Sequence, residues 1–107
     1  MSHIGMVRRI QLIKYRDSIA GAERGQFEEA LKCMPHRIPT VTDWSIGQNI
    51  NPMYPGDRPY NLVWQTEFRD MRGLQVFNTH PYHREFVWPY LNPDDPKCVV
   101  EYHFTVV

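Results

Sequence analysis

The chain has 107 residues, of which 42% are hydrophobic, and its 12 lysine and arginine residues balance 12 aspartate and glutamate residues. This length predicts one domain with a modest core, because so short a chain buries only about 60–65% of its unfolded surface. The absence of net charge argues against nucleic acid or an anionic membrane as a partner, and no apolar run approaches a membrane span. We expect a single cytoplasmic domain over residues 1–107, in which residues 1–6 form a frayed leader.

Residues 7–15 predict the first strand. Apolar side chains alternate onto both of its faces, with Ile10 and Leu12 on one and Ile13 and Tyr15 on the other. A strand with apolar residues on both faces needs to be covered on both.

A helix and a second strand follow. Apolar residues recur at helical spacing from Phe27, which predicts a helix over residues 22–34 that Pro35 ends. Residues 40–48 are rich in β-branched and aromatic side chains and predict a strand. The prolines and glycine after them predict a long loop.

The second half of the chain adds a strand, a helix and a strand. Residues 61–68 alternate as a strand does, Asp70 is placed to cap a helix, and residues 98–106 predict the last strand. The apolar positions of the helix are Met71, Leu74 and Phe77. The order βαββαβ predicts a ferredoxin-like α+β fold, a four-stranded antiparallel sheet with both helices on one face. Its other face needs a partner, and we expect a homodimer.

Residues 77–88 hold two histidines among aromatic side chains. Pro81 suits the first position of a helix, which places His80 at the cap and the helix over residues 81–91. His83 then lies in the first turn, where the helix dipole and apolar neighbours disfavour protonation and favour a neutral base. A histidine on an apolar face also commonly only packs and bonds to the backbone, so both interpretations stay open.

Metal and disulfide sites are not indicated. His80 and His83 stand three apart, but no third ligand is evident. Cys33 and Cys98 lack metal-ligand and disulfide-framework spacing, and are expected to be free thiols packed as small hydrophobic side chains. We predict no structural zinc or transition metal and leave open only a weakly held surface cation.

A family resemblance is carried by residues 78–87, whose sequence Asn-Thr-His-Pro-Tyr-His-Arg-Glu-Phe-Val is similar to the His-Pro-x-His signature of the stress-responsive A/B barrel domain family. Residues 7–17, 38–41, 47–49 and 60–68 resemble its strands and turns in the same order. The resemblance implies that two ferredoxin-like subunits press their open sheet faces together into a dimeric α/β barrel. Each subunit then has a cleft between its sheet and its helices.

The resemblance also implies a chemistry. Family members with assigned activity include plant polyketide cyclases, which need neither metal nor organic cofactor and use a histidine base that His83 matches. The cyclases pair this base with a tyrosine where the present chain has Phe77, which cannot make the hydrogen bond. We therefore expect no cofactor, and a substrate different from theirs.

Several elements line the cleft that the resemblance implies. The candidate catalytic residues are His83, Arg9 and Gln11, and the candidate substrate-binding residues are Ile13, Phe27, Trp64, Thr66, Phe77 and His80. This aromatic lining with few polar groups suits a flat or apolar ligand, with Arg9 placed to hold a carboxylate or phenolate. The large aromatic residues are equally suited to ordinary core packing.

Two classes of function agree with these observations, and a third is excluded. We expect a cofactor-independent small-molecule enzyme of the lyase, isomerase or cyclase type, with a histidine base in an aromatic cleft. The alternative is a non-catalytic dimer that binds a hydrophobic or aromatic metabolite, or a dimer with a filled core that takes no ligand. RNA-recognition modules share the βαββαβ order, but the third strand here lacks their basic-glycine-aromatic signature, so no nucleic acid is expected.

Overall fold

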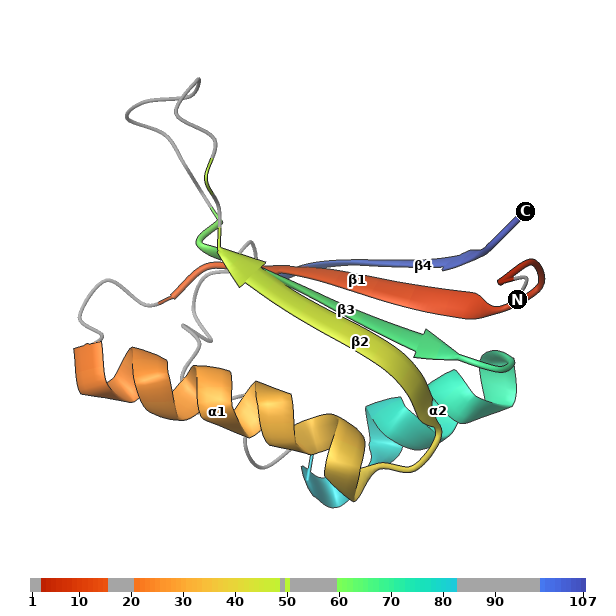
Figure 1. The fold of residues 1–107 in the computed structure, drawn as a ribbon, viewed down its shortest axis with the longest axis horizontal. Helices are drawn as coiled ribbons and strands as arrows, with labels where there is room; N and C mark the ends of the chain where they lie inside the picture. The colour runs from red at the N-terminus through yellow and green to blue at the C-terminus, as the bar shows by residue number, and fades with distance from the viewer. Residues whose placement is uncertain (1–2, 16–20, 49, 51–59, 83–98) are drawn as a thin grey trace.

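The computed structural model describes residues 3–15, 21–48, 50, 60–82 and 99–107. Its elements are β1 (Val7–Ile13), α1 (Gly21–Arg37), β2 (Val41–Gln48), β3 (Leu62–Phe68), α2 (Met71–Thr79) and β4 (Val99–Thr105). The strands form one antiparallel sheet in the order β2-β3-β1-β4, and both helices lie on one side of it (Figure 1). The predicted βαββαβ order and ferredoxin-like fold are confirmed.

The helix ends show one correct and one incorrect prediction. Asp70 caps α2, because its Oδ1 accepts the backbone N–H of Gly73 at 2.9 Å. Pro35 does not end α1, which continues to Arg37. The loss of one N–H donor is tolerated in the last turn, and the backbone N–H of Ile38 still donates to the carbonyl of Met34 at 2.9 Å.

Residues 3–6 differ from the frayed leader that we expected. The backbone N–H of Gly5 donates to the carbonyl of Val106 at 2.8 Å, and the N–H of Val106 donates to Met6 at 2.9 Å. The imidazole of His3 contacts the carboxylate of Glu67. This segment is therefore tied to the sheet, while residues 1–2 lie outside the described residues.

Cys33 and Met71 are more exposed than the sequence predicts. Cys33 is a free cysteine, but it lies exposed on α1 and does not pack as a small hydrophobic side chain; Cys98 lies outside the described residues. Met71 is 49% exposed, whereas Leu74 and Phe77 of the same helix are buried as predicted. Neither described helix is long and apolar enough to cross a membrane.

The two faces of the sheet have different neighbours. The inner face, toward the helices, presents alternate residues of β1 that are buried, from Val7 to Ile13. Together with Trp64 and Phe68 of β3 and Phe77 of α2 they form the core. The helix α1 lies against β2, and α2 lies against β1, β2 and β3. Neither of these two helices packs on β4. The inner side of β4 is therefore the least covered part of the inner face.

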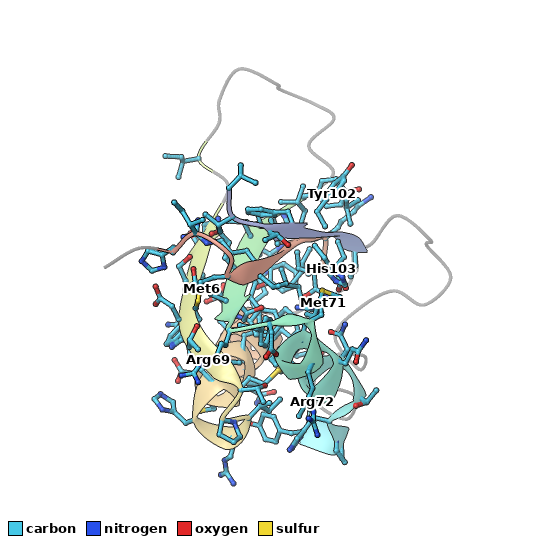
Figure 2. All side chains as sticks on the ribbon, turned by 90° about the vertical axis from the view of Figure 1, so that its right-hand side faces the viewer. Met6, Arg69, Met71, Arg72, Tyr102 and His103 are labelled. Carbon is cyan, nitrogen blue, oxygen red and sulfur yellow. The ribbon has the colours of Figure 1, made fainter. Side chains whose placement is uncertain are left out.

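The open face, away from the helices, carries apolar side chains. The strand register places Ile10 beside Tyr102 and Leu12 beside Val100 on this face. Tyr102 is 67% exposed and Phe104 is 40% exposed. Figure 2 shows Tyr102 and His103 on opposite sides of β4, with His103 on the side of α2. The alternation predicted for the first and last strands is thus present.

Candidate functional site

Arg9 is the centre of the candidate site. Its side chain is only 1% exposed, on the inner face of β1, and its guanidinium Nη2 lies 2.7 Å from Oε1 of Glu101. The guanidinium also lies 5.3 Å from the ring centre of Trp64 and 5.0 Å from that of Phe77. A cation on aromatic faces is stabilised by their quadrupoles, so the Glu101 carboxylate and these two rings all help to hold Arg9.

Two neutral polar residues lie beside Arg9. Thr66 of β3 pairs directly with Arg9 across the sheet, and Gln11 follows two positions along β1 on the same face. Gln11 Nε2 donates to Glu101 Oε1 at 2.9 Å. The buried Oε1 of Gln11 and Oγ1 of Thr66 have no hydrogen-bond partner among the described residues. Such atoms are uncommon in native proteins and mark a place for a ligand or a water molecule.

Glu101 and His103 complete what we call the Arg9 cluster (Arg9, Gln11, Thr66, Glu101 and His103). The register pairs Gln11 with Glu101 and Arg9 with His103, so both β4 side chains lie on the inner face. Nε2 of His103 lies 2.5 Å from Oε2 of Glu101, and because a carboxylate only accepts, the imidazole N–H is the donor. The side chains of Glu101 and His103 are 30% and 34% exposed, so they form the rim above the buried Arg9.

The ionisation of the cluster follows from these contacts. Burial lowers the pKa of Arg9 to about 10, an effect that the adjacent Glu101 charge opposes, so the guanidinium is charged at neutral pH. Burial also acts to raise the pKa of Glu101, but the Arg9 charge and the hydrogen bonds from His103 and Gln11 outweigh it and lower that pKa. The pair is therefore a guanidinium and a carboxylate across the physiological range.

The predicted lining residues fall into two groups. Trp64 and Phe77 are fully buried beside Arg9, with their ring centres 5.5 Å apart. Ile13 and Phe27 are also fully buried, but Ile13 lies four residues, about 13 Å, further along β1 than Arg9. Phe27 packs edge-on against Tyr15 beyond it, with ring centres 5.7 Å apart. The structure thus brings Trp64 and Phe77 to the Arg9 cluster and leaves Ile13 and Phe27 in the core under α1.

Of the two histidines in the His-Pro-x-His signature, the structure describes His80 but not His83. His80 follows α2, and its Nδ1 accepts the backbone N–H of Tyr82 at 3.1 Å, which matches the capping role predicted beside Pro81. Pro81 and Tyr82 are helical, as predicted for the start of the helix over residues 81–91. His83 and the rest of that helix lie outside the described residues. The role of His83 as a base therefore stays a prediction.

Sequence reasoning missed Glu101 and His103. The signal was present, because a strand with Val100, Tyr102 and Phe104 on one side must place residues 101 and 103 on the other. What the sequence did not show was that β4 pairs with β1 in the register that sets these residues beside Arg9 and Gln11. The surroundings of Arg9 are consequently more polar than the aromatic lining predicted from the sequence.

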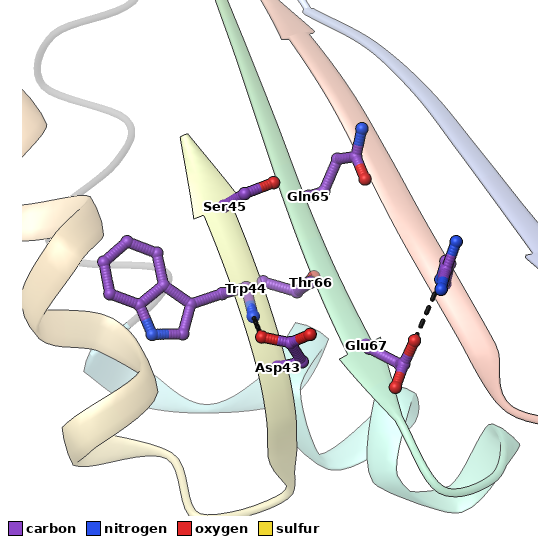
Figure 3. Close-up of a pocket in the computed structure, with 7 residues that line it drawn as sticks. Asp43, Trp44, Ser45, Gln65, Thr66 and Glu67 are labelled. Atoms are coloured by element: carbon purple, nitrogen blue, oxygen red, sulfur yellow. Dashed lines mark hydrogen bonds and ion pairs between the residues drawn. The ribbon is translucent and has the colours of Figure 1, made fainter. Parts of the chain in front are cut away.

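The described part of the chain has no cluster of metal ligands, and its hollows lie away from Arg9. No group of three or more histidine, cysteine, aspartate or glutamate side chains gathers there as a metal site would require. A hollow of about 150 Å³ on the sheet is lined by Asp43, Ser45 and Gln65 among others (Figure 3). Another, of about 420 Å³, lies between the end of β1 and the start of α1, near Tyr15 and Arg24. Neither contains Arg9 or Gln11.

Comparison with solved structures supports the fold. A dimeric ferredoxin-like protein of unknown function from Thermobifida fusca is 21% identical, with 94% of this chain and 91% of that chain covered and a TM-score of 0.74. Hydroxynitrile lyase from Passiflora edulis is 17% identical, with 95% and 94% covered and a TM-score of 0.79. A Dabb family protein from Mesorhizobium loti is 20% identical, with 96% and 98% covered and a TM-score of 0.74. At these identities the likeness shows the fold alone.

Comparison by sequence identifies the family. No curated protein matches the chain significantly. The model of the stress responsive A/B barrel domain, Dabb, matches residues 7–100, which is most of the chain. The resemblance seen in the His-Pro-x-His segment is thereby confirmed, and the protein belongs to the stress responsive A/B barrel domain family.

Proposed function

We propose that the protein is a cofactor-independent enzyme of the lyase, isomerase or cyclase type, acting on a small carbonyl-bearing or aromatic molecule beside the Arg9 cluster. The observation that carries the proposal is the burial of Arg9 against Glu101 between two aromatic rings. A buried ion pair contributes little to stability compared with apolar residues of the same size. Perturbed charged groups of this kind gather at functional sites.

The proposed mechanism assigns one task to each group. His83 takes a proton from the substrate as a neutral general base, in keeping with its place in the sequence signature. Negative charge then develops on a substrate oxygen and needs a hydrogen-bond donor. Because Arg9 is already paired with Glu101, the hydroxyl of Thr66 is the donor that this proposal assigns. In this proposal the Thr66 hydroxyl replaces the tyrosine hydroxyl that is absent at Phe77.

A homodimer is part of the proposal. It is supported by the exposed apolar residues of the open face, among them Tyr102 and Phe104, and by the dimeric state of the structural relative from Thermobifida fusca. A stable dimer of this kind buries about 1,200 Å² or more in total. A cytoplasmic location belongs to the same proposal and is supported by the exposed thiol of Cys33, which suits a reducing compartment.

The test of the catalytic proposal is a comparison of histidine variants. The protein is dialysed against a chelator and assayed with aromatic hydroxynitriles and aromatic β-hydroxy ketones, whose cleavage releases an aldehyde with strong ultraviolet absorbance. We expect His83→Ala to lower kcat by about 10²–10⁴, the usual contribution of a positioned base. His36→Ala, at an exposed position of α1, is the matched control and should keep full activity.

Two results would contradict this mechanism. Turnover that survives His83→Ala but collapses in Arg9→Ala would show that the pocket works by electrostatic orientation alone. Saturable binding of these compounds without any turnover would instead support the alternative of a non-catalytic dimer that binds a hydrophobic or aromatic metabolite.

A further inference from the structure

The charge of Arg9 is already neutralised inside the protein. Its guanidinium is almost completely buried and lies 2.7 Å from the Glu101 carboxylate, with Trp64 and Phe77 beside it. Glu101 is the more exposed partner, at the rim, so a ligand that approaches from the solvent side of β4 meets the carboxylate before the guanidinium. This differs from the expectation that Arg9 holds a carboxylate or phenolate of the ligand.

The described strands place few other titratable groups on the inner face of the sheet. Across β1, β3 and β4, the inner positions given by the register carry three titratable side chains, those of Arg9, Glu101 and His103. Within the Arg9 cluster, the guanidinium of Arg9 and the carboxylate of Glu101 neutralise each other. Each of its two neutral side chains in the core carries a buried atom without a hydrogen-bond partner among the described residues, the hydroxyl of Thr66 and the amide oxygen of Gln11.

We propose that the Arg9 cluster selects an uncharged ligand, and that Glu101 sets this selectivity by occupying Arg9. The inference rests on the proposed function only in taking this cluster as the ligand site. An anion placed here meets the Glu101 carboxylate in a medium of low dielectric constant, and a cation meets Arg9. Either ion also loses its hydration without gaining a free counter-charge.

The ligand class follows from the two neutral groups. Thr66 offers a hydroxyl that both donates and accepts, and Gln11 Oε1 accepts. A ligand that satisfies both carries an acceptor such as a carbonyl or nitrile next to a donor such as a hydroxyl or amide N–H. Uncharged hydroxy ketones, hydroxynitriles and primary amides have this pattern on an aromatic or aliphatic body.

Three probes that share a phenyl ring but differ in net charge test the selectivity of the wild-type protein. Benzamide is neutral, benzoate is an anion and benzamidinium is a cation, and the dissociation constant of each is measured by calorimetry at neutral pH. We expect benzamide to bind at least about tenfold more tightly than either ion, because the ions pay the cost of desolvation. Equal or tighter binding of benzoate overturns the proposal, as does the failure of all three to bind.

Charge-removing variants test the role of Glu101. In Glu101→Gln the charge of the guanidinium is no longer compensated by Glu101, so benzoate should gain about 100-fold in affinity and overtake benzamide. The matched control is Glu67→Gln on the open face, a carboxylate that also contacts an arginine and a histidine, where the preference should not change. Loss of benzoate affinity in Glu101→Gln overturns the assignment.

A double variant covers the case in which Glu101→Gln does not fold. Arg9→Met with Glu101→Gln removes both charges, so no charge is left buried alone, and benzamide should remain the preferred probe. A preference for benzoate in this variant would contradict the proposal. None of these measurements needs turnover, so their outcome is independent of the His83→Ala assay.

Discussion

The two faces of the sheet each hold a glutamate between an arginine and a histidine, but the burial is reversed. On the inner face the arginine is buried, with Arg9 1% exposed and its partner Glu101 30% exposed. On the open face the carboxylate is buried, with Glu67 6% exposed and Arg8 35% exposed at 2.9 Å. Two ion pairs of the same chemical type should therefore differ in how much unfolding free energy is lost when the carboxylate is removed.

The reason lies in which charge water can reach. If Glu101 is removed, the guanidinium of Arg9 stays in a dry site between aromatic rings. If Glu67 is removed, Arg8 and the half-exposed His3 regain hydration. A charge left alone in a dry site is costly, whereas a charge that water can reach is rehydrated when its partner is removed.

Removal of each carboxylate tests this contrast and has the largest expected effect. Glu101→Ala should lower the free energy of unfolding by about 3–5 kcal/mol. Glu67→Ala should lower it by about 1 kcal/mol, because its partners become solvated. Urea denaturation of both variants measures the difference, and equal losses would show that the two pairs are energetically alike.

A charge introduced on the open face tests whether that face forms the dimer interface. Tyr102→Arg places a cation among the apolar residues of that face and should weaken the proposed dimer about 100-fold, or about 2.7 kcal/mol, without unfolding the subunit. Met71→Arg, at an exposed position of α2, is the matched control. Analytical ultracentrifugation distinguishes them, and an unchanged dimer in Tyr102→Arg would place the interface elsewhere.

Acid should destabilise the protein through both carboxylates. The pKa of Glu101 and that of Glu67 are lowered from 4.5, although burial acts to raise each one. A lowered pKa contributes stability that is present above pH 4.5 and is lost as the pH falls through the folded-state value. We expect the urea midpoint to fall between about pH 6 and about pH 3, and to fall less in Glu101→Gln. An identical fall in that variant would exclude Glu101 as a cause.

Much of the fold could be predicted from the sequence, and less of the site. Alternation in residues 7–15 and 98–106 and the Asp70 cap located their elements, because these signals are local. The prediction that the helix ends at Pro35 was wrong, because the last turn of a helix tolerates the loss of one backbone N–H. Glu101 and His103 were missed because their position beside Arg9 depends on the pairing of strands about 90 residues apart, which no local pattern encodes.

The smallest expected effect concerns Thr66. Its hydroxyl is buried and has no hydrogen-bond partner among the described residues, so Thr66→Val should change the free energy of unfolding by less than about 1 kcal/mol. Thr42 on β2 is the control, because its hydroxyl donates to the carbonyl of Glu67 at 3.1 Å. If Thr66→Val is as costly as a lost buried hydrogen bond, the hydroxyl serves the fold and is not reserved for a ligand.

The central claim is that the inner face, and not the open face, is where the protein meets a small molecule. Nuclear magnetic resonance of the isotope-labelled protein with benzamide tests it most directly. We predict that the resonances of the Gln11 side-chain amide, the Thr66 backbone amide and the His103 imidazole shift together with one dissociation constant. Shifts confined to Asp43, Ser45 and Gln65, around the hollow shown in Figure 3, would contradict it.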